Sequence, residues 1–553
     1  MAITVENGIC SDGTTTLSKG QNGAYEIGSL DQLNLFRDAV NAGFDFKGET
    51  VMLTASIDLN NEVWTPIGKT GTTFEGTFDG NGQTVSNLYI NTPDDACVGF
   101  FNETNSATTI KNLTINNVNI SGDNYAGAIV GYGYLGKISN CDVTGTIEIS
   151  GRWFVGGISG HGYAAVDSCE VIAEEGSDSF IKGSAGYVGG IFGYRAEDTS
   201  ISNCTVSNIT ISGSSWGVGG ISGIAQYGSV IEGCTVENTT ITATDLNGDN
   251  VGLIAGANLG NAASPAILLN NNVDAATIAN VTVDGVKVEN PPMLGEDQNS
   301  ATQGEAAIIG DVTLNEAGEI TGGTITVVGT AKSSVDVNSK LDLADNQVFY
   351  PNGDGTYGVD DAGYVASVNG VRYTSLDKAL AVAGEGDTIM LLDNVTLSSK
   401  LSLSQDQVFE LNGFTLDGAV SLSGDADVTF RNGKMTAAYS STSRNEYSVV
   451  TVNGSAVLTL DGVTLTPADS SNQSQATHAV VYQSTGALNI VNSTVSGGNL
   501  VHDGNYTSGS GTAANAIYTY AVSGGTIRIE GSTITGGAGK TEDAVYDGSY
   551  KSG

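Results

Sequence analysis

A six-residue phrase returns five times between residues 126 and 256, and it limits the possible folds more than any other feature of the chain. Each copy opens with alanine or valine, continues with glycine, carries isoleucine in fourth place and ends on glycine. The final glycines are Gly131, Gly160, Gly193, Gly223 and Gly256, which lie 29, 33, 30 and 33 residues apart. A period of about thirty residues is typical of chains built from stacked repeats.

A second phrase follows most copies, and its third place is filled mainly by residues that tolerate a left-handed backbone. Two examples are Ile138–Val143 and Ile201–Val206, which both read Ile-Ser-Asn-Cys-x-Val. The third place holds Asn87, Asn112, Asn140, Ser168, Asn203, Gly233 and Asn270. Because asparagine and glycine accept positive φ at little cost, we predict a tight bend between two short strands at this place in every unit.

Three short β runs in a unit of about thirty residues indicate one coil of a parallel β-helix. A β-propeller is the competing architecture, but each of its blades needs four strands in about forty residues or more. The fourth place of the bend phrase is then expected to point into the core, and it holds Leu88, Leu113, Cys141, Cys169, Cys204 and Cys234. Because cysteine alternates with leucine there, we interpret the column as a ladder of small hydrophobic side chains. Adjacent coils would still bring two cysteines within disulfide reach, so their redox state stays open.

The pattern runs twice along the chain, which predicts an all-β fold of two parallel β-helix (solenoid) domains, each with an N-terminal capping helix. Residues 1–60 are expected to form the first cap, with a helix from the capping-box pattern at Ser29 to Gly43 and a strand over Val51–Leu59. Residues 61–345 form the first β-helix and residues 346–363 a turn-rich linker. Residues 364–553 form the second β-helix, whose helix is predicted from Ser375 to Gly384. Its bends are predicted at Gly413, Asn432, Gly462, Asn492 and Gly531.

The chain is strongly acidic, with a formal net charge of −39 at pH 7. Such a charge repels nucleic acid and anionic lipid, so neither is an expected partner. No apolar run reaches the length of a membrane span, and the first residues lack a basic-then-apolar signal segment. Either the protein is cytosolic, or this chain is the mature or truncated part of something larger that does not insert into a membrane. We favour the second, with an extracellular or cell-surface location.

The glycine phrases at 155, 188 and 218, together with Phe78–Val85, resemble the GLUG repeats of large bacterial surface proteins, adhesin-like proteins and some IgA-peptidase-type proteins. Residues 367–377 are similar to β-helix modules of gut-bacterial surface proteins. The resemblance implies a β-solenoid and a surface context. The family brings no catalytic residues that could be carried over.

Catalytic and metal-binding patterns are weak in this sequence. Gly160-His161-Gly162 is similar to an element of polygalacturonases, but the neighbouring copies read Gly-Tyr and Gly-Ile, and the acidic partners of that family are missing. His478 and His502 are isolated. Residues 245–249 space oxygen ligands like the start of an EF-hand loop, although Asn250 replaces the usual glycine. We therefore expect no catalytic residues, no metal site and no cofactor, with weak calcium binding as the alternative.

Aromatic residues gather around the glycine phrases, and they are the best functional clue in the sequence. The candidate ligand-binding residues are Tyr132, Tyr134, Trp153, His161, Tyr163, Tyr194 and Trp216. If these rings project outward, they form a stripe that suits saccharides or peptides. Packing of the rings beneath loops remains open, because the glycine-rich strands leave their inward and outward faces undefined.

These observations favour a secreted or surface adhesin-like or scaffold protein that binds glycans or proteins of a host or neighbouring cell along a solenoid face. Two alternatives remain open. One is a glycosidase or lyase acting on polysaccharides, and the other is a passive stalk.

Overall fold

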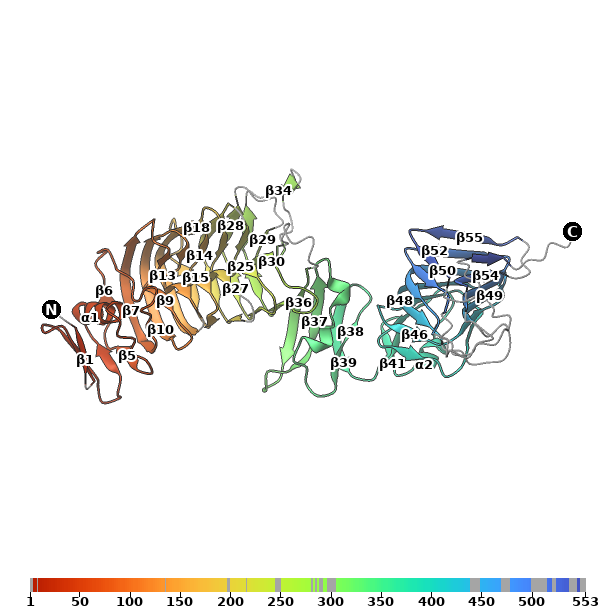
Figure 1. Ribbon diagram of the computed structural model, residues 1–553, viewed down its shortest axis with the longest axis horizontal. Coiled ribbons are helices and arrows are strands. Elements are labelled where there is room, and N and C mark those ends of the chain that lie inside the picture. The colour runs from red at the N-terminus through yellow and green to blue at the C-terminus, as the bar shows by residue number, and fades with distance from the viewer. Residues whose placement is uncertain are drawn as a thin grey trace, which may run out of the picture. The chain divides into compact units, whose positions relative to one another are not determined.

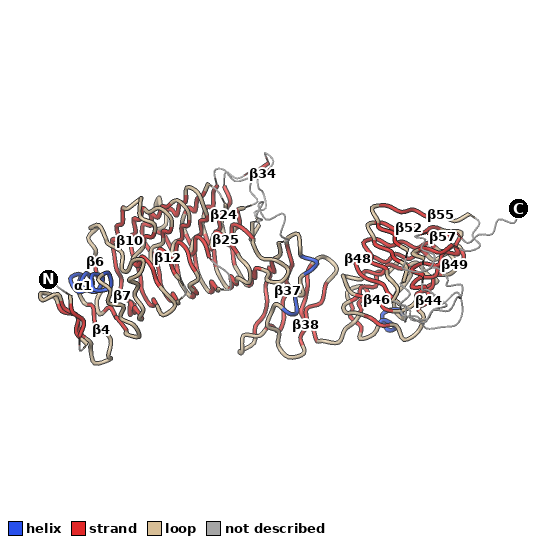
Figure 2. The backbone as a smooth tube through the Cα atoms, in the orientation of Figure 1, coloured by secondary structure: helices blue, strands red, loops and turns tan. Residues whose placement is uncertain are grey.

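The structure is a computed structural model, in which two compact units comprise residues 1–344 and 345–553. It describes residues 3–6, 8–134, 136–195, 199–214, 216–243, 250–279, 282–283, 286–287, 292–295, 305–437, 448–468, 478–498, 515–519, 524–536 and 545–547. Both units are stacks of parallel β coils, as Figures 1 and 2 show. The predicted all-β fold of two solenoids is confirmed.

Unit 1 begins with a cap around one helix. Three antiparallel strands, β1 (Thr4–Glu6), β2 (Ile9–Ser11) and β3 (Thr16–Ser18), precede β4 (Tyr25–Ile27) and α1 (Leu30–Asn41). The helix begins where predicted, because the Ser29 side chain accepts a hydrogen bond from the Gln32 backbone N–H at 3.3 Å. Its apolar face, which includes Leu33 and Phe36, is buried against the first coil.

The coils of unit 1 pair in register through parallel strands. The first three main strands are long and carry the bends within them: β7 (Thr77–Asn91), β10 (Thr109–Ser121) and β13 (Lys137–Gly151). The later coils divide into three columns. These are β16 (Ala165–Asp167), β21 (Ser200–Ser202), β26 (Val230–Glu232) and β31 (Ala266–Leu269); β17 (Glu170–Ala173), β22 (Thr205–Ser207), β27 (Thr235–Glu237) and β32 (Asn272–Asp274); and β18 (Phe180–Gly183), β23 (Thr210–Gly213), β28 (Thr240–Ala243) and β33 (Thr277–Ala279). An antiparallel pair, β36 (Ala307–Leu314) and β37 (Ile320–Val328), follows the last of these coils.

Unit 2 begins with two antiparallel hairpins and a short helix. These elements are β38 (Gln347–Pro351), β39 (Thr356–Asp361), β40 (Ala366–Val368), β41 (Val371–Tyr373) and α2 (Leu376–Leu380). Its parallel columns contain β42 (Thr388–Leu391), β45 (Gln407–Glu410), β48 (Asp427–Thr436), β50 (Val457–Leu465), β52 (Ala487–Val491) and β55 (Thr526–Glu530); β44 (Leu401–Leu403), β47 (Val420–Leu422), β49 (Ser448–Gly454), β51 (His478–Ser484), β54 (Ile517–Thr519) and β57 (Val545–Asp547); and β43 (Val395–Thr396), β46 (Thr415–Asp417), β53 (Thr494–Ser496) and β56 (Thr533–Thr535).

Two local predictions were wrong. The helix from Ser375 ends at Leu380, several residues before Gly384, because its last turn tightens onto the Ala379 carbonyl. The strand expected over 51–59 is split into β5 (Thr50–Leu53) and β6 (Ile57–Asp58) by a bend at residues 54–56. In addition, the segment 346–363, predicted as a turn-rich linker, contains a hairpin in which β38 and β39 pair along five residues.

The bend prediction is confirmed at every position named for it. Asn87, Asn112, Asn140, Ser168, Asn203, Gly233 and Asn270 all have positive φ in unit 1, as do Gly413, Asn432, Gly462, Asn492 and Gly531 in unit 2. Several of the asparagines also bond between coils. The Asn140 side-chain amide donates to Asn112 Oδ1 at 3.3 Å, and that of Asn112 donates to Asp79 Oδ1 at 3.0 Å. Asparagine thus supplies both the left-handed turn and a hydrogen bond between neighbouring coils.

Replacing Asn140 should separate these two contributions. Asn140→Ala puts a Cβ-bearing residue without local hydrogen bonding at φ 50° and removes the bond to Asn112. We expect it to lower the free energy of unfolding by about 2 kcal/mol. Asn140→Gly keeps the turn and should lose about 1 kcal/mol. Urea unfolding measures both, and equal losses for the two variants would contradict a backbone contribution.

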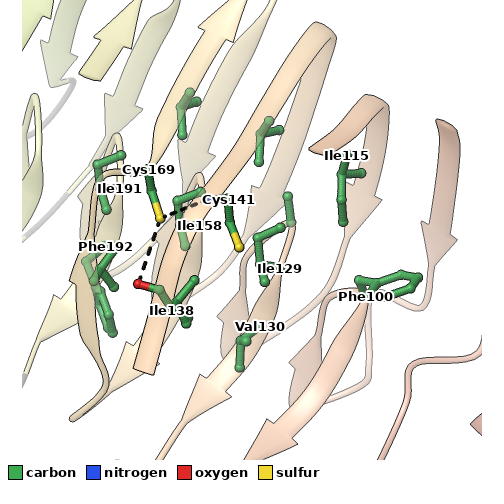
Figure 3. Close-up of a cluster of buried hydrophobic side chains, with 14 of the residues drawn as sticks. Phe100, Ile115, Ile129, Val130, Ile138, Cys141, Ile158, Cys169, Ile191 and Phe192 are labelled. Atoms are coloured by element: carbon green, nitrogen blue, oxygen red, sulfur yellow. Dashed lines mark hydrogen bonds between the residues drawn. The ribbon is translucent and has the colours of Figure 1, made fainter. Parts of the chain in front are cut away.

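The cysteine column lies in the core, as predicted. Cys141, Cys169, Cys204 and Cys234 are fully buried free thiols, and the Cys141 N–H donates to Cys169 Sγ at 3.4 Å (Figure 3). Leu113 pairs in register with Cys141, so leucine and cysteine occupy one column. Hydrogen bonds between neighbouring thiols and burial raise the pKa of Cys204 and of Cys234. These thiols are therefore packing groups with little thiolate character.

The glycine phrase forms a narrow arch of two strands in each coil. One parallel sheet holds the first strands, β8 (Cys97–Val98), β11 (Tyr125–Ala126), β14 (Phe154–Gly156), β19 (Tyr187–Gly189), β24 (Gly217–Gly219) and β29 (Val251–Gly252). A second sheet holds the returning strands, β9 (Phe101–Thr104), β12 (Val130–Gly133), β15 (Ser159–Gly162), β20 (Phe192–Arg195), β25 (Ser222–Ala225) and β30 (Ala255–Asn258).

The two sheets of the arch touch backbone to backbone through their glycines. A Cβ on Gly160 would lie 2.5 Å from the Ala126 nitrogen, and one on Gly193 would lie 2.4 Å from the Val155 nitrogen. Such distances leave no room for a side chain between the sheets. The residues at the open base of the arch are therefore brought close to one another, and many of them are aromatic.

Candidate functional site

Two ladders of rings meet at the base of the arch. In the first sheet, Tyr125, Phe154 and Tyr187 are register partners on β11, β14 and β19. In the second sheet, the register partners on β12, β15 and β20 are Tyr132, His161 and Tyr194. The parallel register stacks the rings of each ladder along the solenoid axis. The narrow arch sets the two ladders side by side.

The six ladder rings form one packed cluster. Within the second ladder, His161 stacks between Tyr132 and Tyr194 with centroid distances of 5.1 and 4.7 Å. Across the ladders, the His161 ring lies 5.0 Å from that of Tyr125 and 5.1 Å from that of Phe154. Because these ring faces cover one another, the cluster offers mainly ring edges to a ligand.

Four further rings flank the cluster and are more accessible. Tyr134 and Tyr163 follow the second ladder, are 48% and 36% exposed, and lie 5.7 Å apart in edge contact. Trp153 and Trp216 precede the first-sheet strands and lie 5.4 Å apart, also in edge contact. Trp216 is 45% exposed, whereas Trp153 is partly buried.

The tryptophan pair depends on a glycine. Gly186 lies in the coil between Trp153 and Trp216, and a Cβ on it would approach the Trp153 carbonyl oxygen to 1.8 Å. The absence of a side chain lets the two indoles meet across this coil. Trp216 itself has φ 70°, which is unusual for a large residue and is the kind of backbone strain that gathers at functional sites.

All seven sequence-predicted ligand residues thus join one continuous set of ring contacts. Three of them, Tyr132, His161 and Tyr194, are interior members of the cluster. The exposed members are Tyr134, Tyr163 and Trp216, and Trp153 is partly buried beside them. The role of Gly186 was not predicted from the sequence. The available signal was that a glycine stands directly before an aromatic strand residue, at a place where other coils carry tryptophan.

His161 is held neutral by its surroundings. Burial lowers the pKa of His161 to about 4, and its Nδ1 is buried without a hydrogen-bond partner. The rings that surround it supply no carboxylate to pair with an imidazolium. A general acid or base needs a pKa near the working pH, so this histidine is poorly suited to proton transfer at neutral pH.

Acid should therefore weaken unit 1 through His161. The pKa of this group is about 4 in the folded protein and about 6.5 when unfolded, so the unfolded state binds the proton more tightly. Stability should fall as the pH drops from 6.5 to 4, by about 3 kcal/mol at most for this group. His161→Tyr, which copies Tyr132 and Tyr194, should remove this part of the pH dependence. Urea unfolding of both proteins across this range measures the difference, and parallel curves would contradict it.

The other candidate groups give no catalytic or metal site among the described residues. His478 stacks on Tyr518 and accepts a hydrogen bond from the Asn515 N–H, and burial lowers its pKa to about 4. His502 and the calcium-like segment 245–249 lie outside the described residues. In the described part of the chain, no three His, Cys, Asp or Glu side chains gather as metal ligands would.

One pair of carboxylates lies on neighbouring strands of the solenoid. Asp142 and Glu170 are register partners on β13 and β17, and burial together with the Glu170 charge raises the pKa of Asp142. Paired carboxylates are the groups that glycosidases use. Their strands lie outside the two arch sheets that carry the rings.

Comparison with known proteins identifies the repeat. The GLUG motif matches residues 122–148 and 214–242, which include two of the arches, so the chain carries GLUG repeats. It is 34% identical over 165 residues to halomucin of Haloquadratum walsbyi, which is 26% of this chain and 2% of halomucin. It is 29% identical over 123 residues to a candidate Gly-rich membrane protein of Evansella cellulosilytica, which is 22% of this chain and 14% of that protein. The chain therefore spans a small part of the relatives it matches.

Among solved structures, the chain is similar to a candidate immunoglobulin A1 protease from Bacteroides ovatus, at 20% identity and a TM-score of 0.36. The likeness covers 50% of this chain and 84% of that one. The motif and the solenoid fit a surface protein. Since Haloquadratum is an archaeon, the resemblance does not restrict this type of protein to bacteria. Within the described residues, neither helix is long and apolar enough to span a bilayer.

Proposed function

We propose that this protein is a surface or secreted adhesin-like protein that binds saccharides at the ring cluster of the arch. The observation that carries the proposal is the group of three exposed rings, Tyr134, Tyr163 and Trp216, which lie with the partly buried Trp153 beside the packed ladders. Tyrosine and tryptophan combine a large apolar face with a polar edge, and few torsion angles need to be fixed on binding. A sugar ring can stack on such a face and bond at its rim.

The rigid base supports this role. Tyr134 touches Tyr132 of the cluster at 6.2 Å, Trp216 touches Tyr187 at 5.4 Å, and Tyr163 is held through its contact with Tyr134. A ligand therefore meets side chains that are already ordered, and ordering them on binding costs little. A passive stalk would have no need to keep large rings at the surface of successive coils.

The proposal is tested by applying the full chain to a glycan array, with and without calcium, and by mass analysis of the bound saccharide. We expect binding of intact saccharide. A dependence on calcium would show that a cation takes part in binding. Shortened saccharide would overturn the non-enzymatic proposal and direct attention to Asp142 and Glu170. Absence of binding to every saccharide would favour a stalk or a protein ligand instead.

A further inference from the structure

The loop that precedes the first arch strand carries one arginine among acidic neighbours. Backbone hydrogen bonds join the equivalent loops of successive coils, each coil being one level of the stack. The Asp123 N–H donates to the Asp95 carbonyl at 2.9 Å, and the Arg152 N–H donates to the Asp123 carbonyl at 2.6 Å. The Ala185 N–H then donates to the Arg152 carbonyl at 2.7 Å. The column therefore reads Asp95, Asp123, Arg152 and Ala185, with a single positive charge next to the tryptophan pair.

The Arg152 guanidinium contacts the ring of Trp153 and does not pair with the carboxylate of Asp123. It lies over Trp153, with Cζ 5.3 Å from the ring centroid, and makes no ion pair or side-chain hydrogen bond within the described part of the chain. Asp123, one level away, is thus not its ion-pair partner. A guanidinium presents five N–H donors in a planar fork, and stacking on an aromatic ring leaves those donors at its edge available. The residue is exposed, so a ligand can reach the fork.

We infer that Arg152, Trp153 and Trp216 form a subsite for a sugar unit that carries a carboxylate. This inference rests on the proposed saccharide binding and adds the class of ligand. The indole of Trp216 offers a face for the sugar ring, while the fork of Arg152 can take both carboxylate oxygens, which is the geometry that guanidinium matches best. Asp123 is joined to Arg152 through the backbone, and its charge opposes a negative ligand, so the preference arises from Arg152.

The test compares two probes that differ only at C6 of each unit: an oligosaccharide of galacturonic acid and its galactose counterpart. Titrations use the full chain at 0.15 M salt, where charges farther apart than about 8 Å are largely screened. We expect the wild type to bind the uronate probe about tenfold more tightly than the neutral one, because a bidentate charged pair is gained. Asp123→Asn should widen the preference.

Arg152→Gln is the decisive variant. It should bind both probes equally, because the group that distinguishes the carboxylate is lost. Arg152→Lys keeps the charge but loses the fork, so it should retain only part of the preference. A preference that survives Arg152→Gln would overturn the inference and leave saccharide binding standing. Binding of neither probe by the wild type would remove the inference together with the proposed function for this class of saccharide.

Discussion

Gly193→Ala is expected to disrupt the arch severely, because the added methyl group would collide with backbone atoms. The new Cβ would lie 2.4 Å from the Val155 nitrogen, 2.6 Å from the Gly160 oxygen and 2.8 Å from the Phe154 carbonyl carbon. All three are backbone atoms, two in the facing sheet and one on the neighbouring strand of the same sheet, so no side-chain rotation can relieve the clash. We expect a loss of about 3 kcal/mol or more from the free energy of unfolding of unit 1, measured in urea.

A matched control lies in the same unit. A Cβ on Gly322, in β37, would have Thr313 Cβ as its nearest neighbour at 3.7 Å, which is ordinary contact. Gly322→Ala should therefore change the stability by less than about 0.5 kcal/mol. If Gly193→Ala and Gly322→Ala unfold alike, the two sheets of the arch are not in backbone contact.

Trp216→Ala should cause the largest loss of saccharide binding. It removes the accessible indole and leaves Trp153 without its partner across Gly186. An aromatic residue at the centre of a binding surface is commonly worth about 2 kcal/mol, which corresponds to about a 30-fold rise in Kd. Titration calorimetry with the tightest array ligand measures this change.

Two controls separate binding from folding. Trp216→Gly removes the same ring but suits the backbone at φ 70°, so it should be more stable than Trp216→Ala and bind equally poorly. Tyr89→Ala removes a partly buried ring on β7, outside the arch sheets, and should leave the affinity unchanged. Equal affinity of Trp216→Gly and the wild type would contradict a role for this indole.

The coil architecture could be predicted from sequence because each coil repeats the same local chemistry. The bend column at Asn140 and its equivalents needs positive φ, and the column at Cys141 needs a small apolar side chain, so both recur at a fixed period. The N-terminal sheet β1–β3 and the β38–β39 hairpin do not repeat. Their antiparallel pairing depends on turns that occur once, and the repeat period carries no information about them.

The sequence predicted which aromatic residues belong to the site, but not how their rings are arranged. Sequence spacing brought Tyr132, His161 and Tyr194 to one column, but it could not tell which rings lie inside the cluster. That depends on the closeness of the two arch sheets, which follows from glycine contacts between different coils. The same close packing buries the Nδ1 atom of His161 without a hydrogen-bond partner and brings the two indoles together across Gly186.

The most direct test of saccharide binding at the arch is the indole N–H spectrum of the full chain during titration with the tightest array ligand. The chain has three tryptophans, so three indole signals are expected. Trp153 and Trp216 belong to the arch, whereas Trp64 is 3% exposed and stacks on Phe100 at 5.3 Å in the core next to the cap. We predict that ligand shifts the signals of Trp153 and Trp216 and leaves that of Trp64 in place. Saturating ligand that moves neither arch signal would contradict the account.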